Sequence, residues 1–346
     1  MKNKFTKIIA LLCAAALMIS AIGMLASCEK ADDADKKNDN SPVTDKLDTK
    51  TEINVSVLNG PTGFGAAKLI SDAGEKKASL NYKFTVETDA SNILGGLING
   101  SIDIAALPTN AAANAYNKTG GKVKIVAINT LGVLYVVSTG AEITSFTDLK
   151  GKTVYCPAQN PEFILKALCK ANGLTVGEDI TIDTSFAQPA DLRTAVAAGQ
   201  VEIAVLPEPM VTIAKSANPA LTVALDLTAE WEKVNGESSL AQGCVVVRTE
   251  WAEKNPAELA KFLEEYKASV EFTVANPKEA SELIVATGVF AGKAPVAEKA
   301  IPKCNIVYID GEAMVGPLNT FFSKLFDIAP TAIGGKLPDD GIYYIK

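Results

Sequence analysis

Two stretches of this chain repeat the same pattern. Residues 92–108 read NILGGLINGSIDIAALP, and residues 191–207 read DLRTAVAAGQVEIAVLP. In a gap-free alignment the glycines, acids and prolines coincide: Gly100 with Gly199, Asp103 with Glu202, and Pro108 with Pro207. Each copy predicts a helix, a glycine that ends it, a turn with one acid, and a short apolar strand that stops at proline. A continuously apolar strand after such a helix is typical of a parallel sheet that is covered on both faces.

Chance similarity between two αβ units is the alternative explanation of this repeat. The shared order of glycine, acid and proline favours two similar lobes. A chain of 346 residues, 48% of them hydrophobic, is long enough to give each lobe its own core. The predicted fold class is therefore α/β, with two doubly wound αβ lobes joined by a hinge of two strands.

Two long apolar runs predict where the chain crosses between the lobes. They are Leu131–Ser138 (LGVLYVVS) and Gly243–Val247 (GCVVV). We expect a discontinuous first lobe of residues 52–137 and 243–346, with a second lobe of residues 138–242 inserted into it. The chain after Arg248 is predicted to be mostly helical. Two short crossings would allow the lobes to close on a ligand as rigid bodies.

The N-terminus predicts an export signal and a lipid anchor. Lys2, Lys4 and Lys7 precede an apolar segment, Ile8–Ile22, that is too short to span a bilayer. The sequence Leu-Ala-Ser-Cys that follows resembles a bacterial lipoprotein box. This resemblance implies a signal peptide of residues 1–27, a lipid on Cys28, and attachment to the extracytoplasmic face of the bacterial cell membrane. Residues 28–51 are almost free of apolar side chains and are predicted to form a solvated tether.

The composition argues against several functional classes. The chain has no histidine, which removes the commonest general base and the commonest metal ligand. A net charge of −7 and the lack of a basic patch disfavour nucleic acid as a partner. Four cysteines follow Cys28 without any CxxC spacing, so neither a metal site nor a disulfide framework is predicted. Free thiols and a bridge between Cys156 and Cys169 both remain open.

Four motifs resemble one family of proteins. They are GPTG at residues 60–63, DIAALPTN at 103–110, FTDLKGKTV at 146–154 and EIAVLPEP at 202–209. Together with the leader and the two lobes, they are similar to solute-binding lipoproteins of ABC importers, in the nitrate/sulfonate/taurine and thiamine-precursor (NMT1-like) branch. The resemblance covers residues 52–346 and implies a type II periplasmic-binding-protein fold, a small-molecule solute, an importer permease as partner, a monomer, and neither catalysis nor cofactor.

Two alternatives from other classes stay open. A thiamine-pyrimidine synthase resembles these proteins in fold, but it is understood to consume an active-site histidine, which this chain lacks. A ligand-sensing module for a membrane receptor is the other alternative, and it requires a separate receptor.

Ligands of open α/β sheets bind beyond the carboxyl ends of the strands, and this rule selects the predicted site. Each selected residue also has a purely structural explanation, because glycines relieve strain and prolines begin helices. The residues predicted to line the cleft are Asn59, Pro61, Thr62, Gly63, Phe64, Asp89, Pro108, Thr109, Asn110 and Thr130 in the first lobe, and Gln159, Asn160, Phe186, Gln188 and Glu208 in the second.

The charge of the cleft loops predicts the charge of the ligand. These loops contain Asp89, Glu162 and Glu208 but neither arginine nor lysine. We therefore expect a neutral or weakly basic solute such as a vitamin precursor, with Glu208 or Asp89 accepting a hydrogen bond from its amine. A small anion such as a sulfonate or nitrate, held by backbone N–H groups at helix N-termini, is the alternative.

Overall fold

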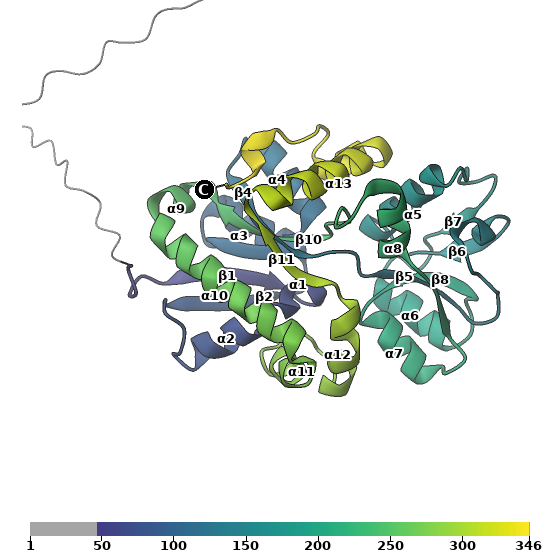
Figure 1. The fold of residues 1–346 in the computed structure, drawn as a ribbon, viewed down its shortest axis with the longest axis horizontal. Helices are drawn as coiled ribbons and strands as arrows, with labels where there is room; N and C mark the ends of the chain where they lie inside the picture. Colours follow the sequence, from purple (N-terminus) through teal and green to yellow (C-terminus); the bar gives the residue numbers. More distant parts are fainter. Residues whose placement is uncertain (1–46, 346) are drawn as a thin grey trace, which may run out of the picture. The chain divides into compact units, whose positions relative to one another are not determined.

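The structure, a computed structural model, describes residues 47–345 (Figure 1). The predicted signal peptide, the lipid site at Cys28 and most of the predicted tether lie outside this range. Of the tether, Leu47 packs against the apolar core. The backbone N–H of Asp48 donates to Glu258 at 2.8 Å. Residues 47 and 48 therefore already contact the folded part of the chain.

The first lobe is built on a six-stranded sheet in the order β11-β4-β10-β3-β1-β2. β1, β2 and β3 run parallel, while β10 runs antiparallel to both of its neighbours. The strands are β1 (Ile53–Leu58), β2 (Tyr82–Glu87), β3 (Ile104–Pro108), β4 (Val123–Thr130), β10 (Gly243–Arg248) and β11 (Ile306–Asp310).

The second lobe is built on a five-stranded sheet in the order β7-β6-β8-β5-β9. Here β5 is the strand that runs antiparallel to its neighbours, β8 and β9. The strands are β5 (Leu134–Ser138), β6 (Thr153–Tyr155), β7 (Thr181–Asp183), β8 (Ile203–Pro207) and β9 (Thr222–Asp226).

The sequence repeat corresponds to equivalent places in the two sheets. α3 (Ala90–Asn99) leads through Gly100 into β3, and α6 (Pro189–Ala197) leads through Gly199 into β8. Both glycines are left-handed, with φ of 85° and 71°, a conformation that glycine adopts without strain. β3 lies between a parallel strand and the antiparallel β10, just as β8 lies between β6 and the antiparallel β5. The prediction of two αβ lobes is confirmed.

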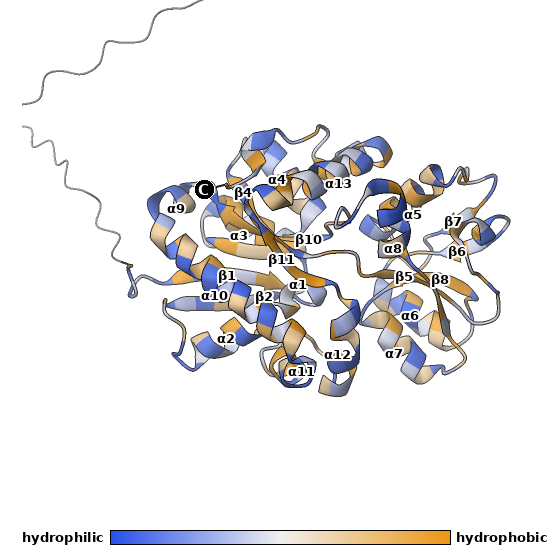
Figure 2. Ribbon diagram, viewed as in Figure 1, coloured by the Kyte–Doolittle hydropathy of each residue, from blue (hydrophilic) through white to orange (hydrophobic). Residues whose placement is uncertain are grey.

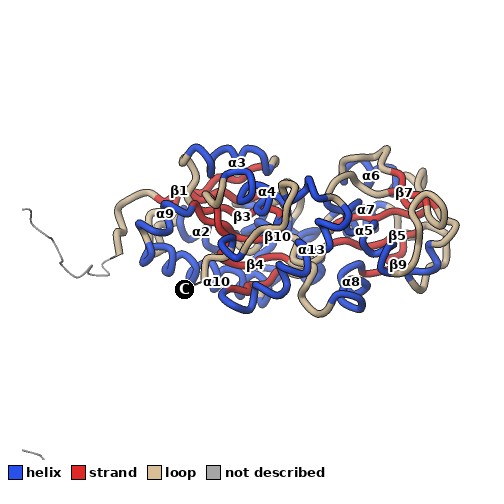
Figure 3. The backbone as a smooth tube through the Cα atoms, turned by 90° about the horizontal axis from the view of Figure 1, so that it is seen from above, coloured by secondary structure: helices blue, strands red, loops and turns tan. Residues whose placement is uncertain are grey.

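Helices cover both faces of each sheet, as the view from above shows (Figure 3). In the first lobe they are α1 (Pro61–Phe64), α2 (Ala67–Gly74), α3, α4 (Thr109–Thr119), α9 (Thr249–Lys254), α10 (Pro256–Ala275), α11 (Pro277–Ala286), α12 (Ala294–Ala300) and α13 (Val315–Ile328). In the second lobe they are α5 (Asn160–Ala171), α6, α7 (Met210–Ala217) and α8 (Leu227–Asn235). Apolar residues follow the central strands, and polar residues lie on the outer faces of the helices (Figure 2). This distribution is expected of sheets that are buried on both faces.

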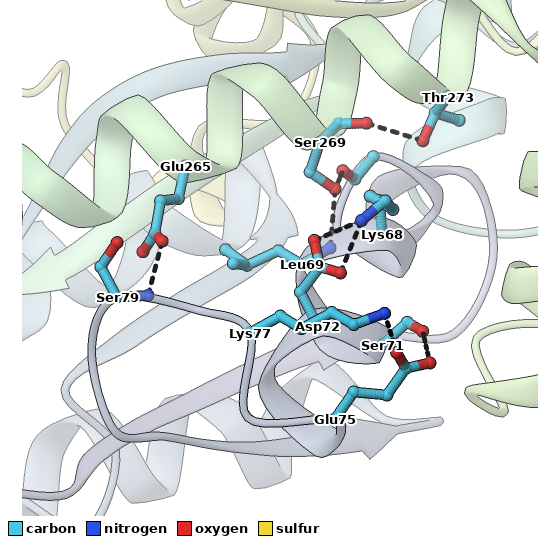
Figure 4. Close-up of polar contacts among 11 residues, drawn as sticks. Lys68, Leu69, Ser71, Asp72, Glu75, Lys77, Ser79, Glu265, Ser269 and Thr273 are labelled. Atoms are coloured by element: carbon cyan, nitrogen blue, oxygen red, sulfur yellow. Dashed lines mark hydrogen bonds and ion pairs between the residues drawn. The ribbon is translucent and has the colours of Figure 1, made fainter.

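One buried hydroxyl joins α10 to the segment between α1 and α2 (Figure 4). Ser269 Oγ donates to the carbonyl oxygen of Gly65 at 2.6 Å and accepts the N–H of Leu69 at 3.1 Å. These groups lie where the helix is interrupted, so the hydroxyl satisfies backbone groups that would otherwise be buried without a partner. The helical region after β1 is thus divided into two helices, α1 and α2.

Two further expectations differ from the structure. β5 begins at Leu134 and pairs throughout with the second sheet, so the chain leaves the first lobe at residues 131–133 rather than at residue 137. The apolar run from Leu131 is therefore a short crossing followed by a strand of the second lobe. The second difference is β11, which the helical expectation for the C-terminal part missed. It pairs with β4 at the edge of the first sheet.

A shared apolar core connects the lobes at α13. Phe321 and Phe322 of α13 belong to the same buried cluster as Leu165 and Trp231 of the second lobe. The rings of Trp231 and Phe321 lie 6.2 Å apart. The lobes are thus held together by packing as well as by the two crossing segments.

Candidate functional site

A cavity of about 470 Å³ lies between the lobes, where strands from both sheets end. The last residues of β1, β3, β4 and β8 (Leu58, Pro108, Thr130 and Pro207) all line it. We call it the interlobe cavity. Its lining residues are Leu58, Asn59, Gly60, Pro61, Thr62, Pro108, Thr130, Val133, Leu134, Asn160, Pro161, Pro189, Arg193, Pro207, Glu208, Pro209, Met210, Ile213, Gln242, Phe290, Ala291 and Gly292. The volume is that of a site for a small organic molecule.

Helix N-termini surround this cavity because prolines stand at the starts of the helices. Pro161 and Pro189 occupy the first turn of α5 and α6, and Pro209 is the residue before α7. Proline suits the start of a helix, where its missing N–H costs nothing. The N–H groups of the first turns and the positive ends of these helix dipoles therefore lie beside the cavity, where Glu208 already accepts the N–H of Thr212 in α7. Asn160 at the start of α5 adds a buried side-chain oxygen without a hydrogen-bond partner among the described residues.

Arg193 brings a positive charge to the interlobe cavity. It lies within α6, and its guanidinium donates to Thr194 Oγ1 at 3.2 Å. Among residues 47–345, no carboxylate lies within ion-pair distance of this guanidinium. A partly buried guanidinium without an ion-pair partner can hold a carboxylate, sulfonate or similar anion through two parallel hydrogen bonds.

Glu208 is the acid of the interlobe cavity, and only 1% of its surface is exposed. Its carboxylate oxygens accept hydrogen bonds from the N–H of Thr212 at 3.1 Å and from the hydroxyl of Thr212 at 3.0 Å. Lys303 of the first lobe places its Nζ 3.7 Å from the same carboxylate. Burial raises the pKa of Glu208, although the bonds from Thr212 and the charge of Lys303 oppose this shift. Two local donors and a cation thus already engage this acid.

The structure brings about half of the predicted site residues to the cavity. These are Asn59, Pro61, Thr62, Pro108, Thr130, Asn160 and Glu208. Four others lie within two residues of the lining without being part of it: Gly63, Thr109, Asn110 and Gln159.

The remaining predicted residues lie elsewhere for identifiable reasons. Asp89 is exposed and caps α3 by accepting the N–H of Ser91. Phe64 is fully buried against Phe290. Phe186 packs on Tyr155. Gln188 is the exposed residue before α6.

Several lining residues were missed by the sequence reasoning, because it selected loops only. Arg193 and Ile213 lie within the first turns of α6 and α7, beyond the loops that were chosen. Phe290, Ala291 and Gly292 come from a segment between α11 and α12 that follows no strand. Helical periodicity from Pro189 could have indicated Arg193. Nothing in the local sequence indicates Phe290.

The loops selected from the sequence contain neither arginine nor lysine, but Arg193 of α6 also lines the cavity. Of the three acids on which the charge argument rested, only Glu208 lines the cavity. Glu162 instead pairs with Lys166 at 2.6 Å on α5. Arg193 therefore adds to the lining a positive charge that the charge argument did not include.

Other chemistry has little support in the part of the chain that the structure describes. No group of three potential metal ligands occurs within residues 47–345. Within the same range no helix is both long and apolar enough to cross a membrane. Cys156, Cys169, Cys244 and Cys304 are buried free thiols, so Cys156 and Cys169 are not bridged. Burial raises the pKa of Cys169 and of Cys244 to about 12, which keeps both protonated.

Comparisons with known proteins agree with this architecture. A family model described as NMT1/THI5 like matches residues 76–280. An ABC transporter from Parabacteroides distasonis has a TM-score of 0.71 at 26% identity, over 86% of this chain and 100% of that one. No curated protein gives a significant match.

Two sulfonate-binding proteins share the fold at lower identity. The periplasmic aliphatic sulphonate binding protein SsuA from Escherichia coli has a TM-score of 0.66 at 17% identity, over 83% of this chain and 94% of that one. The alkanesulfonate-binding protein SsuA from Xanthomonas axonopodis, bound to MOPS, has a TM-score of 0.58 at 15% identity, over 85% of this chain and 96% of that one.

Proposed function

Because the chain belongs to the NMT1/THI5-like family, we propose that it captures a small organic solute in the interlobe cavity and delivers it to an ABC importer. Its fold is that of the type II periplasmic binding proteins. The observation that carries the proposal is the cavity itself, which strand ends and helix N-termini of both lobes surround. A solute in this place touches both lobes at once, which is the requirement for closure around it.

The solute that the lining favours has an apolar body and an anionic group. Leu58, Met210, Ile213 and Phe290 supply apolar walls. Arg193 supplies a charge without an ion-pair partner within residues 47–345, and the N-terminus of α5 adds N–H donors beside Asn160. This reverses our expectation of a neutral or weakly basic solute and favours the anionic alternative. The sulfonate-binding proteins of the same fold support the proposal.

An enzymatic role has weaker support than binding. The enzymatic alternative is a thiamine-pyrimidine synthase. That chemistry is understood to require a histidine, and the sequence contains none. We therefore infer that the cavity binds its solute without converting it. A role as a sensor that hands its ligand to a receptor is the second alternative, and the same cavity would serve it.

The proposed location is the outer face of the cell membrane, with Cys28 as the lipid attachment site. The lipoprotein-like sequence at residues 25–28 supports this proposal. One acyl chain binds a membrane only marginally, so a multiply acylated cysteine is the physically sufficient anchor.

Native mass spectrometry of the purified protein tests the proposed function directly. We expect a small molecule to co-purify, to be released by unfolding, and to rebind with a dissociation constant that calorimetry can measure. A rebinding solute at about 100 times its dissociation constant should stabilise the fold by about 2.7 kcal/mol. Conversion of that molecule into a product during incubation would contradict the binding role and favour an enzyme.

A further inference from the structure

A short segment of the first lobe contacts the second lobe at several points. This segment is Lys303, Cys304 and Asn305, which we call the 303–305 segment. The hydroxyl of Tyr135 in β5 donates to the carbonyl oxygen of Lys303 at 2.8 Å. The side-chain amide of Asn305 donates to the carbonyl oxygen of Gly132 at 2.5 Å and to Thr228 Oγ1 at 3.4 Å. The segment is therefore bonded both to the crossing residues and to β5 and α8 of the second lobe.

The backbone of the crossing residues reinforces this contact. The N–H of Leu131 donates to the carbonyl oxygen of Asn305 at 3.0 Å. Asn305 has a φ of 43°, a left-handed conformation that is uncommon for residues other than glycine. Such a conformation persists when surrounding contacts determine it. Cys304, between the two bonded residues, is completely buried.

Glu208 faces both this segment and the interlobe cavity. It lines the cavity from the second lobe, while Lys303 Nζ approaches its carboxylate to 3.7 Å from the first lobe. The side chain of Lys303 is 47% exposed and that of Glu208 is not exposed at all. A carboxylate that is shielded from water is stabilised by a nearby cation, and separation of the lobes removes this cation.

We propose that the 303–305 segment is a polar connection between the lobes, in addition to the two crossing segments and the packing of α13, and that the charge of Glu208 sets its strength. Lys303 acts as a positioning residue, because it touches Glu208 and not the cavity. The inference rests on the proposed function only in treating the interlobe cavity as the solute site. The interlobe contact itself is testable without any solute.

The groups that face Glu208 set the direction of the effect. Burial raises the pKa of Tyr135 and of Cys304, and the negative charge of Glu208 raises each pKa further, so both side chains remain neutral. Lys303 is the cation within ion-pair distance of Glu208 among the described residues, and Arg193 lines the same cavity. Neutralising Glu208 removes the attraction for Lys303, and we therefore expect it to loosen the connection.

Hydrogen exchange at the amide of Leu131 reports on this connection in the full-length protein, because Leu131 is bonded to Asn305, whose side chain bonds Gly132 and Thr228. The Leu131 bond also extends the pairing of β4 with β11, so amides of β4 serve as the reference for that pairing. We expect Glu208→Gln and Lys303→Met each to accelerate this exchange about threefold, a typical effect of losing a partly exposed ion pair. The double variant should be no faster than the faster single variant, since both remove the same contact. Lys303→Arg keeps the positive charge, so exchange should stay as slow as in the wild type. Tyr135→Phe removes the hydrogen bond to the carbonyl oxygen of Lys303, so it should accelerate exchange.

Matched controls distinguish this role from general destabilisation. Lys299→Met and Glu298→Gln remove the same charges from exposed positions of the neighbouring α12, and they should leave Leu131 unchanged. Amides of β1 report on the first lobe as a whole. Unchanged exchange at Leu131 in both Glu208→Gln and Lys303→Met overturns the proposal. The proposal is also overturned if Lys299→Met accelerates the exchange of Leu131 to the same extent, or if the amides of β1 are accelerated as much as Leu131. Failure to find a solute leaves these results unaffected, so the two proposals fail separately.

Discussion

Arg248 donates two hydrogen bonds to Asp103, one from its guanidinium to the carboxylate and one from its backbone N–H to the carbonyl oxygen, both at 2.8 Å. Asp103 is the acid of the first repeat copy, and Arg248 ends the antiparallel strand β10. In the second lobe Thr139, the residue after β5, donates its N–H to the carbonyl oxygen of Glu202 at 3.0 Å. The repeat therefore preserves the backbone contact, while only the first lobe adds an ion pair.

This difference predicts unequal costs for the two acids of the repeat. Asp103 is buried and also accepts the N–H of Asn54 at 3.0 Å. Asp103→Ala leaves the guanidinium of Arg248 without its buried partner and should lower the free energy of unfolding by about 3 kcal/mol. Glu202→Ala, at an exposed position, should change it by less than about 0.5 kcal/mol. Denaturant titration of both variants checks this, and equal losses would contradict the assignment.

The crowded surroundings of Gly132, in the first crossing segment, predict that only glycine fits at this position. A Cβ at this position would lie 2.1 Å from Thr228 Oγ1 and 2.5 Å from Leu240 Cδ2. Gly132→Ala must therefore displace α8 or the crossing segment, and it should cost about 1–3 kcal/mol. Gly95→Ala is the matched control, because nothing lies within 4 Å of its Cβ in α3. We expect the control to stabilise the protein by about 0.5–1 kcal/mol in thermal unfolding.

The buried carboxyl of Glu208 predicts a pH dependence of stability. Burial raises its pKa above the ordinary value of 4.5. The folded protein therefore binds this proton more tightly than the unfolded chain does, and the associated stability is lost as the pH rises through the folded-state pKa. Relative to Glu208→Gln, the wild type should lose stability as the pH rises from about 4.5 towards neutrality. Chemical denaturation of both proteins at several pH values measures this difference. A wild type that gains stability relative to the variant over this range would contradict it.

Arg193 predicts the charge preference of the solute site. Loss of a charge-assisted hydrogen bond costs about 1.5–3 kcal/mol, so Arg193→Gln should weaken binding of an anionic solute by roughly tenfold to a hundredfold. Arg193→Lys should lose part of this affinity, because lysine cannot offer two parallel donors. Calorimetry with sulfonates, nitrate, amidines and aminopyrimidines provides the measurement. Tight binding of an amidine that is indifferent to Arg193→Gln would restore our original expectation of a basic solute.

We predict that Cys28 attaches the protein to the membrane and that the stability of the folded part does not depend on it. Cys28→Ala should release the protein from membranes and leave its melting temperature unchanged, because Cys28 lies outside the compact unit of residues 45–346. Fractionation of cells that express both forms checks this. Equal membrane association of wild type and Cys28→Ala would rule out the lipid anchor.

The local sequence was sufficient to predict the lobes because its signals act over a few residues. Gly100 and Gly199 end helices, prolines end β3 and β8, and apolar runs define the buried strands. Each of these depends on backbone conformation or on side-chain periodicity, which neighbours in the sequence determine.

Contacts between distant residues decided what the sequence alone left open. Arg193 reaches the interlobe cavity only because α6 directs its first turns towards it. Glu208 meets Lys303 only after the C-terminal part of the chain has returned to the first lobe. Similarly, β11 becomes a strand because the edge of β4 offers it hydrogen-bond partners. Burial and charge pairing depend on which surfaces meet in three dimensions. The sequence therefore determined the two lobes and most of their strands, whereas the tertiary structure decided that Arg193 lines the cavity and that Lys303 meets Glu208.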